Sequence, residues 1–216
     1  MTNVLKVDVW SDIACPWCYV GKRRFANGVQ QYVDAGGTRT VDVEYHSFEL
    51  APDTPVDFEG TEVDFLVDFK RMPAERVRQM LGQMTDIAAG EGLAYDFGRL
   101  QHTKTLKAHE LLHHAKAFEL QDAMKERLLR AYFVEGRHVG HIDDLADLAA
   151  EVGLDRAEVV AALADGRHAA AVKADIEQAL AYGISGVPFY VIDGRFGVSG
   201  AQSPEVFAQA LAKASE

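Results

Sequence analysis

The sequence has too few cysteines for a disulfide framework. Only two of its 216 residues are cysteines, Cys15 and Cys18, and two cysteines so close together cannot join distant segments of the chain. Long apolar runs are also missing, since even the alanine-rich stretches carry a charge every few residues, and this excludes a membrane-spanning helix. The role of the two cysteines must therefore be local.

Positive charge is scarce as well. The chain has 22 Lys and Arg residues against 33 Asp and Glu residues, a formal net charge of −11. Because nucleic acids and anionic membranes recruit basic surfaces, we expect neither as a partner. The short basic run of Lys22, Arg23 and Arg24 is interpreted as a solvated helix face, with attraction of a thiolate or of glutathione as the alternative.

A secretory leader is not indicated either. Such a leader has a basic start, an apolar run and a cleavage site of small residues, whereas residues 1–6 lead directly into an alternating segment. We therefore expect the mature chain to begin at Met1 and the protein to be soluble and cytoplasmic. A hydrophobic content of 48% at this length suffices for a large buried core.

The two end regions of the chain combine strands and helices. Alternating apolar and polar residues predict a strand over 5–10, and Pro16 suits the first turn of a helix that continues from 17 to 33. Asp193-Gly194 predicts a hairpin turn between two short strands. The other elements predicted in these regions are strands over 41–45, 189–192 and 196–199 and helices over 169–182 and from Ser203-Pro204 through Leu211.

The middle of the chain is predicted to be entirely helical. Helical periodicity takes over between about Pro52 and about Asp165, and Asp155 suits an N-cap position. The predicted helices cover 63–70, 74–90, 105–118, 120–134, 143–152 and 155–163. Four aromatic side chains of this region are predicted to lie in the core: Phe65, Phe69, Phe118 and Tyr132.

The element order is therefore βαβ, a helical block, and then αββα. This order predicts an α/β fold in which residues 1–52 and 166–216 form one discontinuous domain. Residues 53–165 form a large all-helical insertion domain. The two cysteines lie at the first strand-to-helix junction of the discontinuous domain.

The position of the cysteines points to redox chemistry. Cys15 stands at a helix N-terminus, where unpaired N–H groups and the positive end of the dipole favour a thiolate. Cys18, one turn later, is placed to attack a mixed disulfide formed on Cys15. A zinc half-site would need further ligands. We therefore predict a thiol–disulfide oxidoreductase with Cys15 as the nucleophile and Cys18 as the resolving thiol.

Three segments resemble a known family. They are residues 11–23 (SDIACPWCYVGKR), 186–189 (GVPF) and 198–202 (VSGAQ), and in this order they resemble the DsbA-like thioredoxin superfamily, specifically its FrnE-type cytoplasmic branch. The similarity spans almost the whole chain and implies a thioredoxin-like fold interrupted by a helical insertion. It also implies a cis peptide between Val187 and Pro188 facing the cysteines, and backbone groups of Val187 that bind an extended substrate segment. Pro16 and Trp17 would support the active site, with Trp17 contributing shape and burial.

Two departures from the family limit what carries over. Lys104 precedes Thr105 where relatives often have Asn, and the periplasmic relative has His where Trp17 stands, so its strongly oxidising character is not expected here. In a reducing cytoplasm we expect reduction, isomerisation or redox sensing of a disulfide- or thiol-containing protein or small molecule. Three carboxylates are candidates for tuning the cysteines or accepting a proton from Cys18, with solvated loop or strand-end groups as the simpler interpretation: Asp8, Asp12 and Glu44.

Two alternative functions stay open. Glutathione-dependent isomerases and kappa-type glutathione transferases share the architecture but carry serine at the position of Cys15. Glutathione is therefore a candidate co-substrate, and no other cofactor or metal is expected. His109, Glu110 and His113 match a zinc metallopeptidase motif on a predicted helix, but catalytic zinc needs a third ligand. The candidates for that ligand are Glu135, His138 and His141.

Overall fold

The computed structural model describes residues 4–216, so Met1 lies outside the described residues. The chain divides into two compact units, one made of Met1–Leu50 with Ala170–Glu216 and the other of Ala51–Ala169. The predicted boundaries were 52/53 and 165/166. The first unit carries the sheet and the second carries helices, so the element order is that of an α/β fold with a helical insertion.

The first unit is built on a four-stranded mixed sheet. Its strands are β1 (Val4–Ser11), β2 (Thr40–Ser47), β3 (Phe189–Ile192) and β4 (Phe196–Ser199), in the order β2-β1-β3-β4. β1 runs parallel to β2 and antiparallel to β3, and β3 pairs with β4 through a tight turn. Asp193 and Gly194 both have positive φ in that turn, 54° and 66°, as the predicted Asp-Gly hairpin requires.

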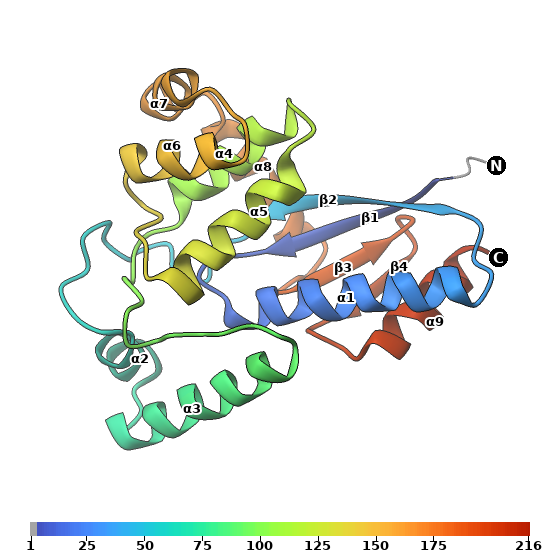
Figure 1. Ribbon diagram of the computed structural model, residues 1–216, viewed down its shortest axis with the longest axis horizontal. Coiled ribbons are helices and arrows are strands. Elements are labelled where there is room, and N and C mark those ends of the chain that lie inside the picture. Colours follow the sequence, from blue (N-terminus) through green and yellow to red (C-terminus); the bar gives the residue numbers. More distant parts are fainter. Residues whose placement is uncertain (1–3) are drawn as a thin grey trace. The chain divides into compact units, whose positions relative to one another are not determined.

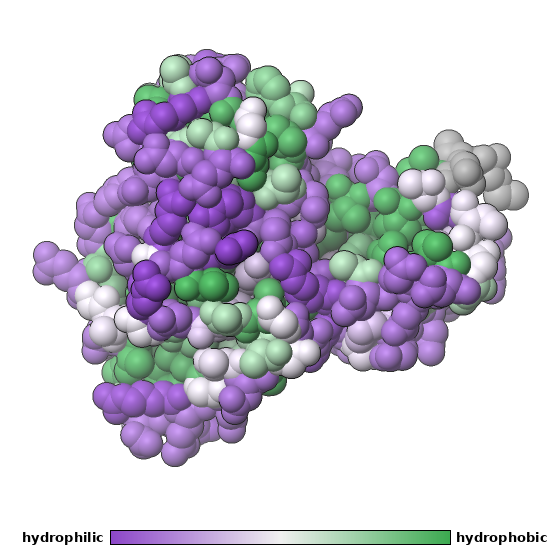
Figure 2. All heavy atoms as spheres, in the orientation of Figure 1, coloured by the Kyte–Doolittle hydropathy of each residue, from purple (hydrophilic) through white to green (hydrophobic). Residues whose placement is uncertain are grey.

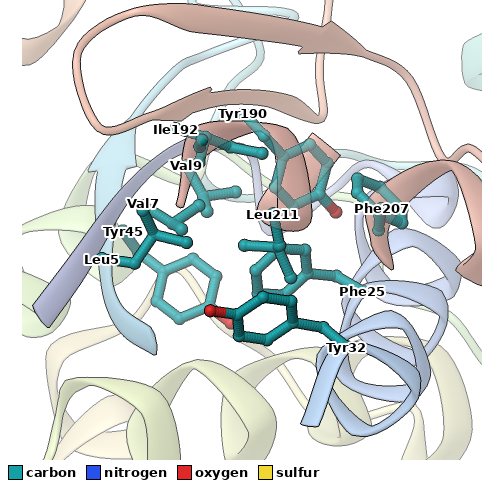
Figure 3. Close-up of a cluster of buried hydrophobic side chains, with 11 residues drawn as sticks. Leu5, Val7, Val9, Phe25, Tyr32, Tyr45, Tyr190, Ile192, Phe207 and Leu211 are labelled. Carbon is teal, nitrogen blue, oxygen red and sulfur yellow. The ribbon is translucent and has the colours of Figure 1, made fainter. Parts of the chain in front are cut away.

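Two helices cover one face of this sheet, α1 (Pro16–Asp34) and α9 (Pro204–Ala214), and they lie side by side in Figure 1. Alternate residues of β1 point toward them, because side chains alternate across a strand. Figure 3 shows the resulting core, in which the strand residues Val7 and Val9 meet Phe25 of α1 and Leu211 of α9. This core fixes the helix that begins at the cysteines.

The opposite face of the sheet carries α8 (Ala169–Ala181), which Gly183 follows with a φ of 70°. Here Trp10 of β1 packs with Ala179 and Ile184. The Trp10 indole also donates a hydrogen bond to the carbonyl oxygen of Asp175, at 3.0 Å. Both faces of β1 are thus buried immediately before the chain reaches Cys15.

The second unit contains six α-helices and a short π-helical segment among its described residues. These elements are α2 (Glu62–Lys70), α3 (Ala74–Gly90), α4 (Leu106–Lys116), α5 (Gln121–Arg130), η1 (Ala131–Glu135), α6 (Ile142–Glu151) and α7 (Arg156–Ala164). Asp155 caps α7 as predicted, since its side chain accepts a hydrogen bond from the Glu158 N–H. The helix predicted over 120–134 instead changes to π-helical geometry after Arg130.

Two aromatic residues predicted for the core of this unit are exposed. Tyr132 is buried, but 53% of Phe69 and 45% of Phe118 remain accessible. Phe69 stacks on Phe65 from the last turn of its helix, at a centroid distance of 5.3 Å, and Phe118 lies beyond the end of α4. The prediction was wrong for Phe69 and Phe118 because a side chain at the end of a helix has protein on fewer sides and is therefore partly exposed to solvent.

The described residues include no helix long and apolar enough to cross a membrane. The face drawn in Figure 2 is mostly hydrophilic, with hydrophobic residues gathered in separate patches. This agrees with the scarcity of long apolar runs in the sequence.

Candidate active site

The two cysteines lie at the start of α1. Cys15 is the N-cap residue, with extended backbone angles (φ −94°, ψ 111°), and Pro16 occupies the first helical turn. The Cys18 N–H donates a hydrogen bond to the Cys15 carbonyl at 3.0 Å. Neither cysteine is in a disulfide, and both residues are buried, with 4% exposure for Cys15 and 3% for Cys18. Trp17, which the sequence predicts to support the site through shape and burial, is 41% exposed.

The loop before β3 lies directly against Cys15. The Cys15 thiol donates a hydrogen bond to the Val187 carbonyl, with a sulfur–oxygen distance of 3.5 Å. The Val187–Pro188 bond is cis, and the Pro188 carbonyl accepts a hydrogen bond from the N–H of Gly200 at 2.8 Å. Pairing of β1 with β3 brings these segments together, since Trp10 is opposite Phe189 in the ladder.

The surroundings of Cys15 disfavour its thiolate. The side chain of Cys18, burial and the negative charges of Cys18 and Asp12 raise the pKa of the Cys15 thiol well above its usual range. The backbone N–H of Cys18 acts in the opposite direction. The thiolate-favouring effect expected of the helix N-terminus is therefore outweighed, because a buried charge loses its hydration.

Asp12 is the one predicted carboxylate that lies beside the cysteines. It is buried, with 1% exposure, so the alternative of a solvated loop carboxylate was wrong for this residue. Its oxygens accept hydrogen bonds from the Leu50 N–H at 2.8 Å and from the Ala14 N–H at 3.4 Å. Asp12 thus holds the segment that leads into the cysteines while opposing ionisation of Cys15.

Asp8 and Glu44 belong to a different cluster, around His46 on the α8 side of the sheet. The Nδ1 atom of His46 is 2.8 Å from Asp175 and its Nε2 atom is 2.8 Å from Asp8. Lys6 is 3.1 Å from Asp8 and 3.3 Å from Glu44. Burial raises the pKa of Asp8, but hydrogen bonds from His46 and Lys6 outweigh burial and lower it. The carboxylates of Asp8 and Glu44 therefore form ion pairs with Lys6 and His46.

His46 is held as a buried imidazolium. Its ring stacks on Trp10 at a centroid distance of 4.5 Å. Burial lowers the pKa of His46, but the hydrogen bonds of Asp175 and Asp8 and the charges of Asp175 and Glu44 raise it to about 9. The other oxygen of Asp175 accepts a hydrogen bond from the N–H of Ser47 at 2.8 Å. The cluster ties α8 to β1 and β2.

Stability is expected to fall as the pH rises from about 6.5 to about 9. The folded-state pKa of His46, about 9, lies above the unfolded value of 6.5. The protonated imidazole therefore contributes its full stabilisation of the fold below pH 6.5, and this stabilisation is lost as the pH rises through the folded-state pKa. At about 1.4 kcal/mol per pKa unit, the loss amounts to about 3 kcal/mol. Denaturant unfolding across this pH range, with His46→Gln as the reference, measures it. Equal slopes for the two proteins would contradict the prediction.

A close helix–loop contact lies beneath the cysteines, at Gly21. A Cβ atom added there would lie 2.8 Å from the Tyr190 hydroxyl, 2.9 Å from Cγ of Pro188 and 3.4 Å from Cβ of Ala201. The first two distances are too short for a real side chain. Gly21 therefore lets α1 approach the Pro188 loop.

Replacing Gly21 by alanine is expected to lower the free energy of unfolding by about 1–3 kcal/mol, because overpacking outweighs the gain in helix propensity. Gly82 in α3 is the matched control, since nothing lies within 4 Å of a Cβ added there. Gly82→Ala is expected to stabilise the protein by up to about 1 kcal/mol. Denaturant unfolding of both variants distinguishes these outcomes, and stabilisation by both would exclude the close contact.

The predicted basic face of α1 is partly engaged in structure. Arg24 donates a hydrogen bond to the carbonyl of Ala201 at 2.9 Å, and Arg23 donates one to the Tyr19 hydroxyl at 3.3 Å. Arg24 thereby fastens α1 to the 198–202 segment. Lys104, the residue that departs from the family pattern, donates to the carbonyl of Pro52 at 2.6 Å.

The zinc motif lies on α4 without a third ligand among residues 4–216. His109 and Glu110 are fully buried there, with 0% and 1% exposure, and Glu110 pairs with Lys107 at 2.9 Å. The candidate third ligands are engaged elsewhere: Glu135 pairs with Arg127 and Arg130, His138 with Val56, and His141 with Asp57 and Asp144. The motif is therefore part of a helix core.

Two other groups of three metal-ligand side chains occur among the described residues, Asp57 with His138 and His141, and Asp8 with Glu44 and His46. In the first group, the Nδ1 atom of His138 accepts a hydrogen bond from the Gly140 N–H at 3.1 Å. The Nε2 atom of His138 forms a hydrogen bond with the Val56 carbonyl oxygen, also at 3.1 Å. In the second, Lys6 already neutralises both carboxylates. Both groups are thus satisfied by hydrogen bonds and ion pairs.

Sequence reasoning missed Tyr190, which lies beside the site, and the pairing of His46 with Asp175 on the α8 side of the sheet. A signal for the first was available, because a glycine inside a predicted helix often marks a close approach, and Gly21 has this position. His46 and Asp175 are 129 residues apart. No local pattern joins them.

Comparison with known proteins identifies similar chains. A family model described as a DSBA-like thioredoxin domain matches residues 6–212. The crystal structure of the probable DsbA oxidoreductase SCO1869 from Streptomyces coelicolor is 40% identical, with a TM-score of 0.90, and the match covers 97% of this chain and 89% of that one. The uncharacterized protein YwbO of Bacillus subtilis (strain 168) is 28% identical over 207 residues, 95% of this chain and 94% of YwbO.

More distant structures share the fold. The cytosolic disulfide reductase DsbM from Pseudomonas aeruginosa, solved with GSH, is 20% identical with a TM-score of 0.66, covering 96% of this chain and 98% of its own. A 2-hydroxychromene-2-carboxylate isomerase is 16% identical with a TM-score of 0.71, covering 96% and 95%. The matches confirm the thioredoxin-like fold with a helical insertion that the sequence predicted.

Proposed function

The chain belongs to the DSBA-like thioredoxin domain family, and from this premise we propose that it is a thiol–disulfide oxidoreductase in which Cys15 is the nucleophile and Cys18 the resolving thiol. One observation carries the proposal. The Cys15 thiol lies at a helix N-terminus against the Val187 carbonyl, with Cys18 one helical turn behind it. A substrate segment that pairs with the Val187 backbone would bring its disulfide to Cys15.

The proposed reaction has two exchange steps. The Cys15 thiolate attacks one sulfur of the substrate disulfide, a mixed disulfide forms, and the other substrate sulfur leaves as a thiolate that takes up a proton. The Cys18 thiolate then attacks Cys15, so that the Cys15–Cys18 bond forms and the remaining substrate thiol is released. The substrate gains two electrons and the cysteine pair loses two.

The proposed direction is reduction or isomerisation. A Cys thiolate of low pKa stabilises the reduced form of the pair, which makes the disulfide form a strong oxidant. Here the Cys18 side chain, burial and the charge of Asp12 disfavour the Cys15 thiolate. Trp17 also supplies no positive charge beside it. These features support a reducing rather than a strongly oxidising pair, which agrees with the predicted FrnE-type branch and a cytoplasmic location.

Glutathione is the proposed recycling thiol. DsbM, which shares the fold, is described as a cytosolic disulfide reductase and was solved with GSH. Two glutathione molecules would reduce the Cys15–Cys18 disulfide through a glutathione mixed disulfide and leave as oxidised glutathione. The isomerase and transferase alternatives need only one reactive group, so retention of both cysteines favours the dithiol mechanism.

A glutathione redox titration followed by Trp fluorescence tests the proposal. We expect one reversible two-electron transition, with a midpoint nearer that of thioredoxin, about −270 mV, than that of DsbA, about −120 mV. A midpoint close to the DsbA value would overturn the proposed direction. The absence of any transition, together with glutathione-dependent activity in Cys18→Ser, would replace the dithiol reaction by the transferase or isomerase alternative.

A further inference from the structure

Tyr190 is a buried titratable residue that none of the preceding steps uses. It lies on β3 opposite Val9, so its side chain points to the α1 and α9 side of the sheet. The ring is held by Phe25 at a centroid distance of 5.2 Å and by Phe207 at 4.7 Å. Figure 3 shows the ring at the edge of this core beside Phe207. With 2% exposure, its orientation is determined by packing.

The Tyr190 hydroxyl reaches the side of α1 that carries Cys18. It lies 2.8 Å from the position of a Cβ atom on Gly21, and Cγ of Pro188 lies 2.9 Å from the same point. Gly21 follows Cys18 by three residues, and residues with this spacing are neighbours on one face of a helix. The hydroxyl thus lies at the helix face that carries Gly21 and Cys18, close to Pro188.

The phenol is suited to donate a hydrogen bond in this position. Burial raises the pKa of Tyr190 well above its usual range, and the charges of Cys18 and Cys15 raise it further. The group therefore keeps its proton when a neighbouring sulfur becomes negative. Hydrogen bonds to a buried charged group contribute more than those between neutral groups.

Three carboxylates of the first unit are committed to other partners, those of Asp8, Asp12 and Asp175. Asp12 accepts hydrogen bonds from the backbone of Leu50 and Ala14, and its charge opposes ionisation of Cys15. Asp8 and Asp175 hold His46. A neutral donor can favour a thiolate, whereas a nearby carboxylate disfavours it.

We propose that the Tyr190 hydroxyl donates a hydrogen bond to the Cys18 thiolate during resolution of the mixed disulfide. The inference rests on the proposed function and assigns a residue to its second step. Cys18 loses its proton to solvent and attacks Cys15, the Cys15–Cys18 bond forms, and the Cys15–substrate bond breaks. The departing substrate thiolate takes up a proton from solvent, and the proton of Tyr190 stays on the phenol throughout.

Reaction of the reduced protein with Ellman's reagent separates the two steps. Attack by Cys15 releases one coloured thiol, and resolution by Cys18 releases the second. Tyr190→Phe keeps the ring and removes only the hydroxyl, so we expect an unchanged first phase and a second phase slowed on the order of tenfold or more. The pH dependence of this second phase should also shift to higher pH, because the Cys18 thiolate loses a hydrogen-bond donor.

Tyr32→Phe is the matched control. Tyr32 lies in the same core, and its hydroxyl contacts the Ser215 hydroxyl at 2.8 Å, so its loss should leave both phases unchanged. A second phase in Tyr190→Phe with the rate and pH profile of the wild type would overturn the inference. If Tyr190→Phe does not fold, 3-fluorotyrosine at position 190 provides a second test, because a more acidic phenol should accelerate the second phase. No acceleration would overturn the inference.

Failure of the proposed function gives a different result. In that case the wild-type protein itself releases only one coloured thiol. A wild-type protein with two phases and a Tyr190→Phe variant identical to it would remove the role of Tyr190 while leaving the dithiol mechanism in place.

Discussion

Cys15→Ser is expected to abolish disulfide reduction, with a loss on the order of 10³-fold or more. The nucleophile in thiol–disulfide exchange is a thiolate, and a serine hydroxyl neither ionises nor forms a disulfide. Removing the nucleophile of an enzyme causes losses of at least this size. Insulin reduction with glutathione as the reductant gives the rate for the wild type and the variant.

Cys18→Ser provides the matched comparison, since it removes one sulfur a single helical turn away. In this variant Cys15 should still react, and in the absence of glutathione the mixed disulfide should persist because no resolving thiol is present. Mass spectrometry of the intact protein should then show one substrate thiol attached to Cys15. Insulin reduction by Cys15→Ser at the wild-type rate would exclude Cys15 as the nucleophile.

Asp175→Ala is expected to lower the free energy of unfolding by about 3–5 kcal/mol. Removing one partner of a buried ion pair leaves the other charge without compensation. Asp175 is 8% exposed and accepts hydrogen bonds from His46 and from the N–H of Ser47, both at 2.8 Å. Its loss would leave the His46 imidazolium with Asp8 and would remove the carboxylate that accepts from the Ser47 N–H. Denaturant unfolding at pH 6, where His46 is protonated, measures the change.

Lys173→Ala is the control for this variant, because Lys173 lies on the same helix and forms an exposed pair with Glu177 at 3.6 Å. Exposed pairs of this kind contribute at most about 1 kcal/mol. A double-mutant cycle of Asp175→Ala with His46→Leu should show coupling, because the two side chains are in direct contact. Additive effects of the two substitutions would mean that the ion pair does not stabilise the fold.

The elements of the chain were largely predictable from local sequence. The predicted helix over 74–90 and the strands over 189–192 and 196–199 have the observed bounds, and the other elements differ by a few residues at their ends. These elements have amphipathic periods and clear end signals, such as Asp193-Gly194 between two strands and Asp155 before a helix. The π-helical segment after Arg130 has no such signal.

The location of the cysteine pair was also predictable, because Cys15 and Cys18 are three residues apart at the start of one helix and need no partner from elsewhere to be recognised. The roles of the carboxylates were not. Asp8, Asp12 and Glu44 look alike in sequence, yet Asp12 lies beside the cysteines and the other two surround Lys6 and His46. Side chains alternate across β1 and β2, so the identity of the partner on each face decides their function.

The sequence by itself therefore determined the strands, the helices and the position of the cysteine pair at the start of a helix. Only the tertiary structure decided what surrounds that group: the Val187 carbonyl against Cys15, the Tyr190 hydroxyl over Gly21, and Asp175 on His46. Periodicity and capping act over a few residues, so they are visible in the sequence. Burial and hydrogen bonding between β1, α1 and the Pro188 loop join residues up to 172 positions apart, and these contacts form only when the sheet and its helices pack together.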